Sequence, residues 1–248
     1  MRAAISSHRR LTVASIVGVC AVALLAGYAC TRSGSPHRAV ALAPPPTAST
    51  AVGATVLTDP GLPVPAPLTY FGLGLRAAPV PVPLELEIPR IGVKTSVLGV
   101  GMTAKDAMDA PEGRAADPVW QQAFWYRGSA IPGAKSTALI AGHIDDPLGR
   151  DGVFGHIDQL QPGDQIIVHD TRSGLDVRFA VTEAKTYSLA EAADPAVLTR
   201  MYGTGPVAGA WPEPSADGLA HLTLVTCAGT FRNGTHDHRL AVYATRVA

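Results

Sequence analysis

The sequence contains little cysteine and no excess of charge of either sign. Only 3 of its 248 residues are cysteines, and Cys20 and Cys30 lie in an apolar N-terminal run, which leaves Cys227 alone in the remainder. A single cysteine there excludes the disulfide framework typical of small secreted proteins. Lysine plus arginine and aspartate plus glutamate each number 20. This balance gives no basic patch of the kind that nucleic acid requires, so we expect no nucleic-acid partner.

The sequence also lacks a recognisable cofactor or metal motif. No glycine-rich phosphate-binding loop follows a predicted strand, and no internal repeat is present. His236 and His238 alternate around Asp237, but two histidines without further placed ligands are too few for a metal site. We therefore expect no cofactor and no metal. The nearby run Asn-Gly-Thr at residues 233–235 fits a glycosylation sequon, but we interpret it as a tight turn.

The N-terminus is typical of a membrane anchor. Residues 11–30 carry no charged side chain, and a helix of that length rises about 30 Å, the thickness of a bilayer core. Arginines precede this run, so the positive-inside rule places residues 1–10 in the cytoplasm and the rest of the chain outside. We expect an uncleaved, single-pass signal anchor in the cell membrane with an extracellular domain. A cleaved signal peptide and a lipoprotein cut before Cys30 are the alternatives.

Residues 31–83 are rich in proline and alanine and carry little charge. Repeated prolines oppose both helices and inner strands. This composition predicts an extended extracellular stalk or disordered linker.

Residues 84–248 have the length of one domain. Short apolar or alternating segments bounded by turn residues predict eight strands with few, short helices. The predicted strands span residues 84–88, 96–100, 123–126, 137–143, 164–169, 176–186, 221–227 and 240–247. Short helices are predicted over residues 153–160 and 190–201. The pattern indicates a mainly β fold, a closed barrel or a sandwich.

Three residues stand where predicted strands meet turns. His143 ends one strand, Cys227 ends another, and Arg239 immediately precedes the last. Catalytic side chains concentrate where a rigid scaffold meets its loops. Taken singly, each favours a structural role, because an isolated cysteine is most often buried and an isolated arginine is most often a surface cation.

Together these residues resemble the sortase family. The run Thr-Leu-Val-Thr-Cys at residues 223–227 is similar to the sortase signature, and Ala-Gly-His at residues 141–143 resembles the strand end that carries the family histidine. Arg239, before a β-branched strand, resembles the family arginine. The resemblance extends over residues 84–247 and is closest to the actinobacterial class E/F group. It implies a closed eight-stranded β-barrel with a few short helices, preceded by a transmembrane helix and a proline-rich linker.

The resemblance also implies a cysteine transpeptidase. Cys227 is then the nucleophile that forms a thioester, His143 is the general acid for the leaving amine, and Arg239 holds substrate and stabilises the oxyanion. The implied partners are protein substrates with a C-terminal sorting signal of the Leu-Pro-x-Thr-Gly kind, and an amine acceptor on a peptidoglycan precursor or a pilin lysine.

Two other functions stay open at this point. One is a different cysteine acyl-transfer enzyme of the cell wall, and the other is a non-catalytic extracellular β-barrel that binds a partner. For Asp145 and Asp146, the sequence leaves orientation of His143 and a solvated turn equally open. We expect Trp120 and Trp125 to pack in the core or at its rim rather than line a peptide groove.

Overall fold

The computed structural model describes residues 63, 74–104, 106–208 and 210–248. Residues 74–248 belong to one compact unit. The predicted cytoplasmic segment and membrane anchor, and the stalk up to residue 73 apart from Pro63, lie outside the described residues. Within the described ranges, no helix combines the length and the apolar character needed to cross a membrane.

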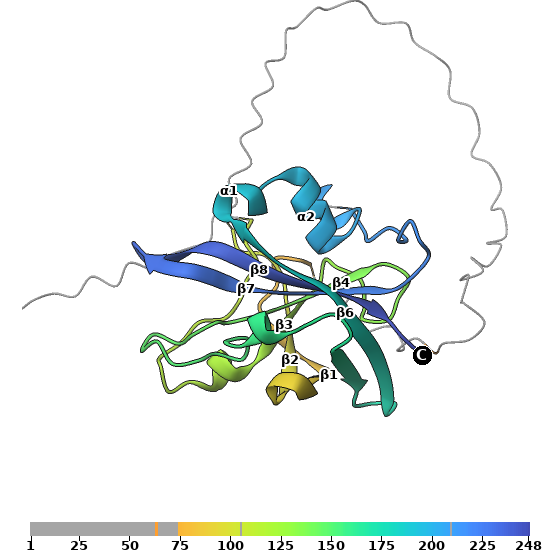
Figure 1. Ribbon diagram of the computed structural model, residues 1–248, viewed down its shortest axis with the longest axis horizontal. Coiled ribbons are helices and arrows are strands. Elements are labelled where there is room, and N and C mark those ends of the chain that lie inside the picture. The colour runs from red at the N-terminus through yellow and green to blue at the C-terminus, as the bar shows by residue number, and fades with distance from the viewer. Residues whose placement is uncertain (1–62, 64–73, 105, 209) are drawn as a thin grey trace, which may run out of the picture. The chain divides into compact units, whose positions relative to one another are not determined.

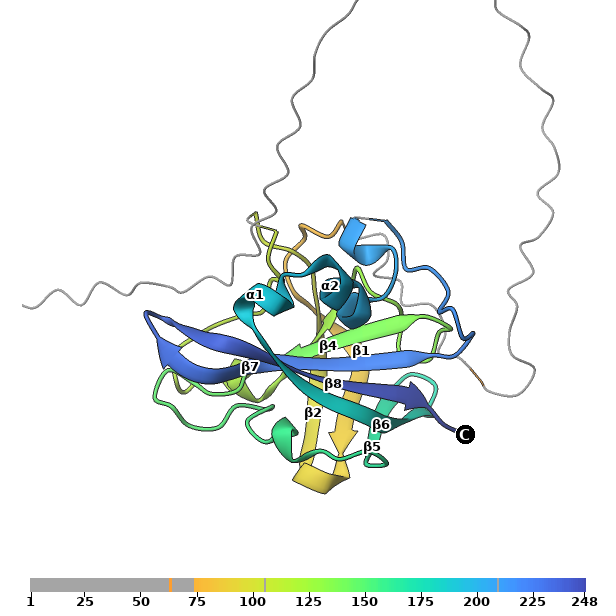
Figure 2. The ribbon, with the colours of Figure 1, turned by 45° about the horizontal axis from the view of Figure 1, so that its top comes forward.

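Eight strands close into a barrel in the order β1-β2-β3-β4-β7-β8-β6-β5 (Figures 1 and 2). They are β1 (Val80–Ile88), β2 (Val93–Val100), β3 (Ala123–Tyr126), β4 (Thr137–Gly142), β5 (Gln165–Asp170), β6 (Leu175–Ser188), β7 (His221–Arg232) and β8 (Thr235–Arg246). The β2–β3 and β4–β7 pairs are parallel, and the other pairs are antiparallel. The structure confirms the predicted mainly β, closed eight-stranded barrel.

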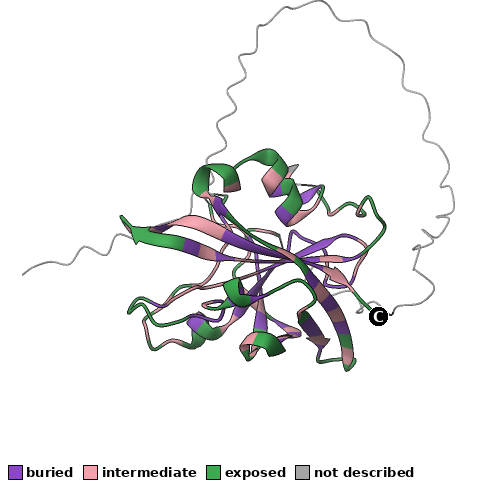
Figure 3. Cartoon of the chain, viewed as in Figure 1, coloured by how far each residue is buried: buried purple, intermediate pink, exposed green. Residues whose placement is uncertain are grey.

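The barrel interior is filled by alternate residues of every strand. Its apolar cluster includes Leu86, Trp125, Ile140, Phe179 and Leu224, each no more than 1% exposed. Figure 3 shows this alternation as purple bands along the strands. A shift of one residue in the pairing would turn these apolar side chains outward, so their burial fixes the strand register.

Several strands are longer than the sequence predicts, most clearly β1, β7 and β8. β1 begins at Val80 and contains Pro81, where the pairing with β2 shifts register. Proline lacks an N–H and is tolerated at such irregularities. β7 runs past Cys227 to Arg232, and β8 starts before Arg239, so both residues lie inside strands rather than at their ends.

The extension of β7 and β8 forms an exposed hairpin. Its turn contains Asn233 and Gly234 with φ of 53° and 83°, the positive values that a two-residue hairpin turn requires. The predicted turn is therefore confirmed. The pairing shifts between Ala228 and Phe231, next to Gly229 with φ of 79°. This bulge separates the pairing near Cys227 from the pairing at the hairpin tip.

Short helices fill the connections. Three 3₁₀ turns are η2 (Pro89–Ile91), η3 (Pro118–Gln121) and η4 (Ile157–Gln159). The β6–β7 connection carries α1 (Leu189–Ala192), α2 (Pro195–Tyr202) and η5 (Pro206–Ala208). The sequence predicted one helix here, but Asp194 and Pro195 divide it, because the residue before a proline disfavours helical backbone. Figures 1 and 2 show α1 and α2 beside β7 and β8.

Residues 74–77, which precede β1, are bound to the connection between β2 and β3. Met102 N–H donates to the Leu75 carbonyl at 2.6 Å, and Arg76 forms an ion pair with Asp106 at 2.6 Å. A Cβ at Gly101 would lie 1.8 Å from the Leu75 carbonyl oxygen, so this close approach requires glycine. Residues 74–77 are therefore part of the folded domain.

Candidate active site

The strand register brings the three predicted site residues together. β4 and β7 are parallel neighbours whose last recorded pair is Ala141 with Val225, and His143 and Cys227 each follow that pair by two residues. In the antiparallel β7–β8 pair, Cys227 lies directly opposite Arg239. Neighbouring strands are about 5 Å apart, and paired residues share a face. Cys227 and Arg239 therefore start from adjacent strands, and His143 directly follows β4, the other neighbour of β7.

Cys227 lies on the outer face of β7. Its neighbours Thr226 and Ala228 are buried, whereas Cys227 is half-buried. The Thr226 hydroxyl donates to the Gly142 carbonyl at 2.8 Å, which ties β7 to the residue before His143. Cys227 thus lies on backbone that is paired with β8 and is itself only half-buried.

His143 follows β4 and is held on several sides. Its Nε2 lies 2.8 Å from the Pro111 carbonyl oxygen. The Trp120 ring lies at a centroid distance of 4.5 Å, and the Phe124 ring lies edge-on at 5.2 Å. The Phe154 N–H donates to the His143 carbonyl at 2.9 Å. The imidazole therefore has little rotational freedom.

Arg239 is fixed by its own strand. Its Nη1 donates to the carbonyl oxygens of His236 at 3.1 Å and His238 at 2.6 Å. The side chain is half-buried, and a guanidinium is always charged in proteins. The site therefore contains a permanent positive charge opposite Cys227.

Asp145 and Asp146 have partners other than His143. Asp146 is 8% exposed and accepts a hydrogen bond from Arg150 Nε at 2.6 Å. Burial raises the pKa of Asp146, but hydrogen bonds from Arg150 and Leu148 outweigh burial and leave the pKa lowered. Asp145 lies 3.3 Å from His236 Nε2. The structure thus gives Asp146 the role of holding the loop after His143.

The remaining predicted residues are placed as follows. Trp125 lies in the barrel interior, and its Nε1 donates to the Ala130 carbonyl at 2.9 Å. His238 Nδ1 lies 2.6 Å from Asp237 Oδ1. Among the residues that the structure describes, no group of three or more His, Cys, Asp or Glu side chains is arranged to hold a metal ion.

A second apolar cluster covers the same outer face, and sequence analysis did not identify it. Met201 of α2 packs there with Leu139, Tyr187 and Tyr243, and Val225 packs beside them. The tyrosine hydroxyls are 3.0 Å apart, and burial raises the pKa of Tyr243, as does the hydrogen bond to Tyr187. The signal in the sequence is the presence of apolar residues at Val225, Ala241 and Tyr243, which lie on the face of their strands opposite to the barrel interior.

Arg200 fastens α2 to this face. Its guanidinium lies 4.1 Å above the Tyr243 ring and forms an ion pair with Glu183. Beside it is a hollow of about 420 Å³ whose lining includes Thr137, Thr223 and Tyr243. This hollow lies toward the beginning of β4 and β7, on the face that carries Cys227 near the other end.

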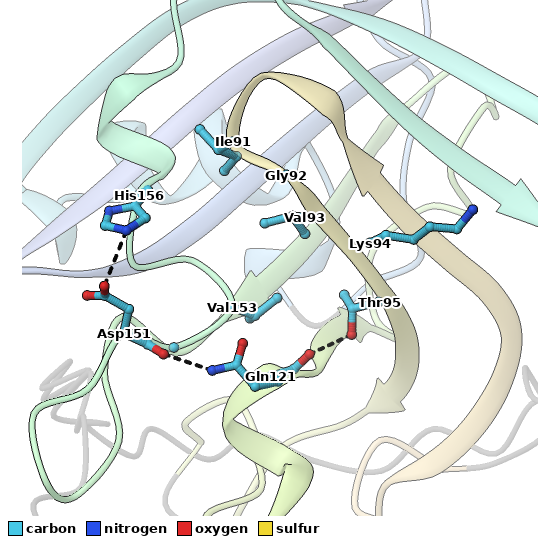
Figure 4. A pocket seen from close by; sticks show the side chains of 10 residues that line it. Ile91, Gly92, Val93, Lys94, Thr95, Gln121, Asp151, Val153 and His156 are labelled. Carbon is cyan, nitrogen blue, oxygen red and sulfur yellow. Dashed lines mark hydrogen bonds and ion pairs between the residues drawn. The ribbon is translucent and has the colours of Figure 1, made fainter.

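A separate pocket of about 300 Å³ lies between the η2–β2 turn and residues 151–156 (Figure 4). Figure 4 shows Gln121 bridging its floor between Thr95 and Asp151, and His156 pairing with Asp151. Its lining includes none of Cys227, His143 and Arg239. This pocket is therefore distinct from the candidate active site.

Comparison with known proteins gives one family. The sortase domain model matches residues 86–247. No curated protein matches this chain.

Among solved structures, sortase A from Corynebacterium diphtheriae has 19% identity and a TM-score of 0.46, with 68% of this chain and 61% of that chain covered. Sortase C-1 from Actinomyces oris has 21% identity and a TM-score of 0.45, with 68% and 74% covered. Sortase C1 from Streptococcus agalactiae has 23% identity and a TM-score of 0.44, with 66% of each chain covered. The match thus spans less than two thirds of the first of these structures.

Proposed function

Because this chain belongs to the sortase family, we propose that it is a cysteine transpeptidase whose nucleophile is Cys227. The observation that supports the proposal is the register that sets Cys227 opposite Arg239, together with the position of His143 directly after β4, the other neighbour of β7. A thiol, an imidazole and a guanidinium carried there would supply a nucleophile, a proton carrier and a fixed positive charge.

The first half-reaction forms a thioester. The Cys227 thiolate attacks a substrate carbonyl, a C–S bond forms, and the carbonyl oxygen becomes an oxyanion that the Arg239 charge stabilises. His143 donates a proton to the departing amine as the peptide bond breaks. In the second half-reaction an acceptor amine attacks the thioester and loses a proton to His143. The C–S bond then breaks and the thiolate is restored.

The proposed substrates follow from the family. The donor is a protein with a C-terminal sorting signal of the Leu-Pro-x-Thr-Gly kind, cleaved after threonine. The acceptor is an amine of a peptidoglycan precursor or a pilin lysine. The proposed setting is the outer side of the cell membrane, with residues 11–30 as the anchor. The uncharged run of that length supports the anchor.

The test is a peptide-library transfer assay with the full chain in detergent. Sorting-signal peptides varied at each position are mixed with an amine acceptor, and products and covalent enzyme adducts are identified by mass spectrometry. We expect an acyl adduct on Cys227 and a transfer product whose sequence defines the motif.

The matched control is Cys227→Ala. It is expected to abolish the adduct and the product while the circular dichroism spectrum stays unchanged. Full transfer by this folded variant would sink the proposal. Resistance of Cys227 to a methanethiosulfonate reagent in the folded protein would contradict it as well.

A further inference from the structure

The connection between β2 and β3 contacts the His143 side chain through Pro111 and Trp120. Pro111, in this connection, is the residue whose carbonyl contacts Nε2 of the imidazole. A carbonyl oxygen only accepts hydrogen bonds, so the nitrogen facing it must carry a proton. When the ring is neutral, the other nitrogen, Nδ1, is then the one without a proton.

Pro111 lies between two anchored points of this connection. On one side, Asp109 N–H donates to the Gly101 carbonyl at 2.9 Å. On the other side, Trp120 Nε1 donates to the Arg114 carbonyl at 2.9 Å. The Trp120 ring that makes this bond also packs on His143. The Trp120 side chain therefore holds both the segment that carries the Pro111 carbonyl and the His143 imidazole.

Asp117 folds the segment between these points. Its Oδ2 accepts a hydrogen bond from Arg114 N–H at 2.7 Å. A Cβ at Gly113 would lie 2.6 Å from the same carboxylate oxygen, so the carboxylate packs tightly on Gly113. Arg150 adds a bond of 2.6 Å to the Ala115 carbonyl. The connection is thus built to keep its shape next to His143.

We propose that the Pro111 carbonyl is a positioning group that fixes His143 with its proton on Nε2, so that Nδ1 exchanges the proton with Cys227. This inference rests on the proposed function for its last step. Its structural part, the fixed tautomer, stands independently and can be measured without activity. Because a histidine with the wrong tautomer cannot pass a proton to its partner, the bond matters for rate rather than for substrate affinity.

The tautomer is measured by ¹⁵N NMR of imidazole-labelled full chain in a Cys227→Ala background, at a pH where the ring is neutral. We expect His143 to show the Nε2–H form. In Asp117→Ala the segment loses the hydrogen bond from the Arg114 N–H, and we expect a mixture of the two tautomers. Asp117→Asn keeps an acceptor oxygen for Arg114 and should restore the single form. Thr95→Val removes a bond to the Gln121 carbonyl at 2.6 Å, on the far side of η3, and serves as the matched control.

The same variants with Cys227 intact are then assayed for transfer. Displacing the carbonyl in Asp117→Ala should lower kcat between about tenfold and 10²-fold, with KM nearly unchanged. Asp117→Asn and Thr95→Val should stay near the parent. An ester in place of the amide between Pro111 and Glu112 weakens the carbonyl as an acceptor and should lower kcat in the same way.

The outcomes separate the inference from the proposed function. An Nδ1–H form in the parent, or an Asp117→Ala variant that loses kcat while keeping a single Nε2–H form, would overturn the positioning role. If the tautomer behaves as expected but no variant, nor the parent, transfers any peptide, the proposed function fails and the fixed tautomer remains.

Discussion

The two faces of β7 differ in what they do, although they are one residue apart. Leu222 and Leu224 point into the barrel and are 0% exposed. Val225 and Cys227 point outward and are half-buried, and Val225 packs against Met201 of the β6–β7 connection. The inner face meets a closed apolar core, and the outer face carries the thiol that we propose as the nucleophile.

Alternate residues of β7 therefore contribute to the core and carry the proposed nucleophile. A closed core of this kind supplies most of the free energy of folding through burial. The outer face supplies positions whose side chains are fixed by that core but not enclosed in it. Substitutions on the inner face should therefore lower stability, and substitutions on the outer face should lower activity.

Arg239→Ala removes the outer-face charge opposite Cys227. Loss of one oxyanion-stabilising group is expected to lower kcat/KM by about 10²–10³-fold. The free energy of unfolding should hardly change, because the guanidinium bonds carbonyls of its own strand. Peptide-transfer kinetics and urea denaturation measure the two effects. Arg239→Lys keeps the positive charge but lacks the planar guanidinium, so its kcat/KM should lie between those of the parent and Arg239→Ala. Unchanged kcat/KM in Arg239→Ala would refute the role.

Leu224→Ala opens a cavity on the inner face. A buried leucine truncation of this kind is expected to lower the free energy of unfolding by about 3 kcal/mol. Activity per folded molecule should be retained at a temperature where the variant is folded. The matched control is Val225→Ala on the outer face, for which we expect a smaller loss of stability and a rise in KM. Equal effects of the two variants would remove the distinction between the faces.

Tyr243→Phe tests the hydrogen bond that joins β6 to β8 on the outer face. The variant loses the hydroxyl that lies 3.0 Å from the Tyr187 hydroxyl. Loss of one buried hydrogen bond is expected to cost about 1 kcal/mol of unfolding free energy. The ring and its contact with Arg200 are kept, so differential scanning calorimetry should show a modest fall in Tm. A Tm equal to that of the parent would show that the hydrogen bond between the two hydroxyls contributes no stability.

The pH dependence of α2 docking gives the smallest effect. The hydrogen bond from Arg200 lowers the pKa of Glu183 below its ordinary value. The stabilisation is therefore fully present above the ordinary pKa of about 4.3 and is lost as the pH falls through the lowered value. Because the pair is partly exposed, we expect a contribution under about 1 kcal/mol. Hydrogen exchange of α2 amides at pH 6 and pH 3 should show a loss of protection that Glu183→Gln does not show.

Much of the fold could be predicted from the sequence because burial imposes alternation. β6 was predicted over residues 176–186 and spans Leu175–Ser188, since Val177, Phe179 and Val181 all face the core. The outer part of the β7–β8 hairpin could not be predicted by alternation, because residues 229–232 are exposed and no face selects apolar side chains.

The sequence proposes the candidate site as a set of side chains but not as an arrangement. His143, Cys227 and Arg239 are identified from their order and neighbours, and the strand register adds that Cys227 lies opposite Arg239. The contact between His143 and Pro111 spans 32 positions and uses a backbone carbonyl. Every residue has such a carbonyl, so no residue type marks the one that faces the imidazole. The contact of Arg200 with the Tyr243 ring could not be predicted either, because it depends on how α2 packs against β8.

The attachment of residues 74–77 has a mechanical consequence. These residues are bound to Met102 and Asp106, at the start of the same connection that later reaches Pro111. A pulling force applied to the chain ahead of residue 74 would stretch these few contacts before it reached the interstrand pairing of β1. The connection that carries Pro111 begins at these contacts, so such a force would reach the surroundings of His143 before it reached the strands of the barrel.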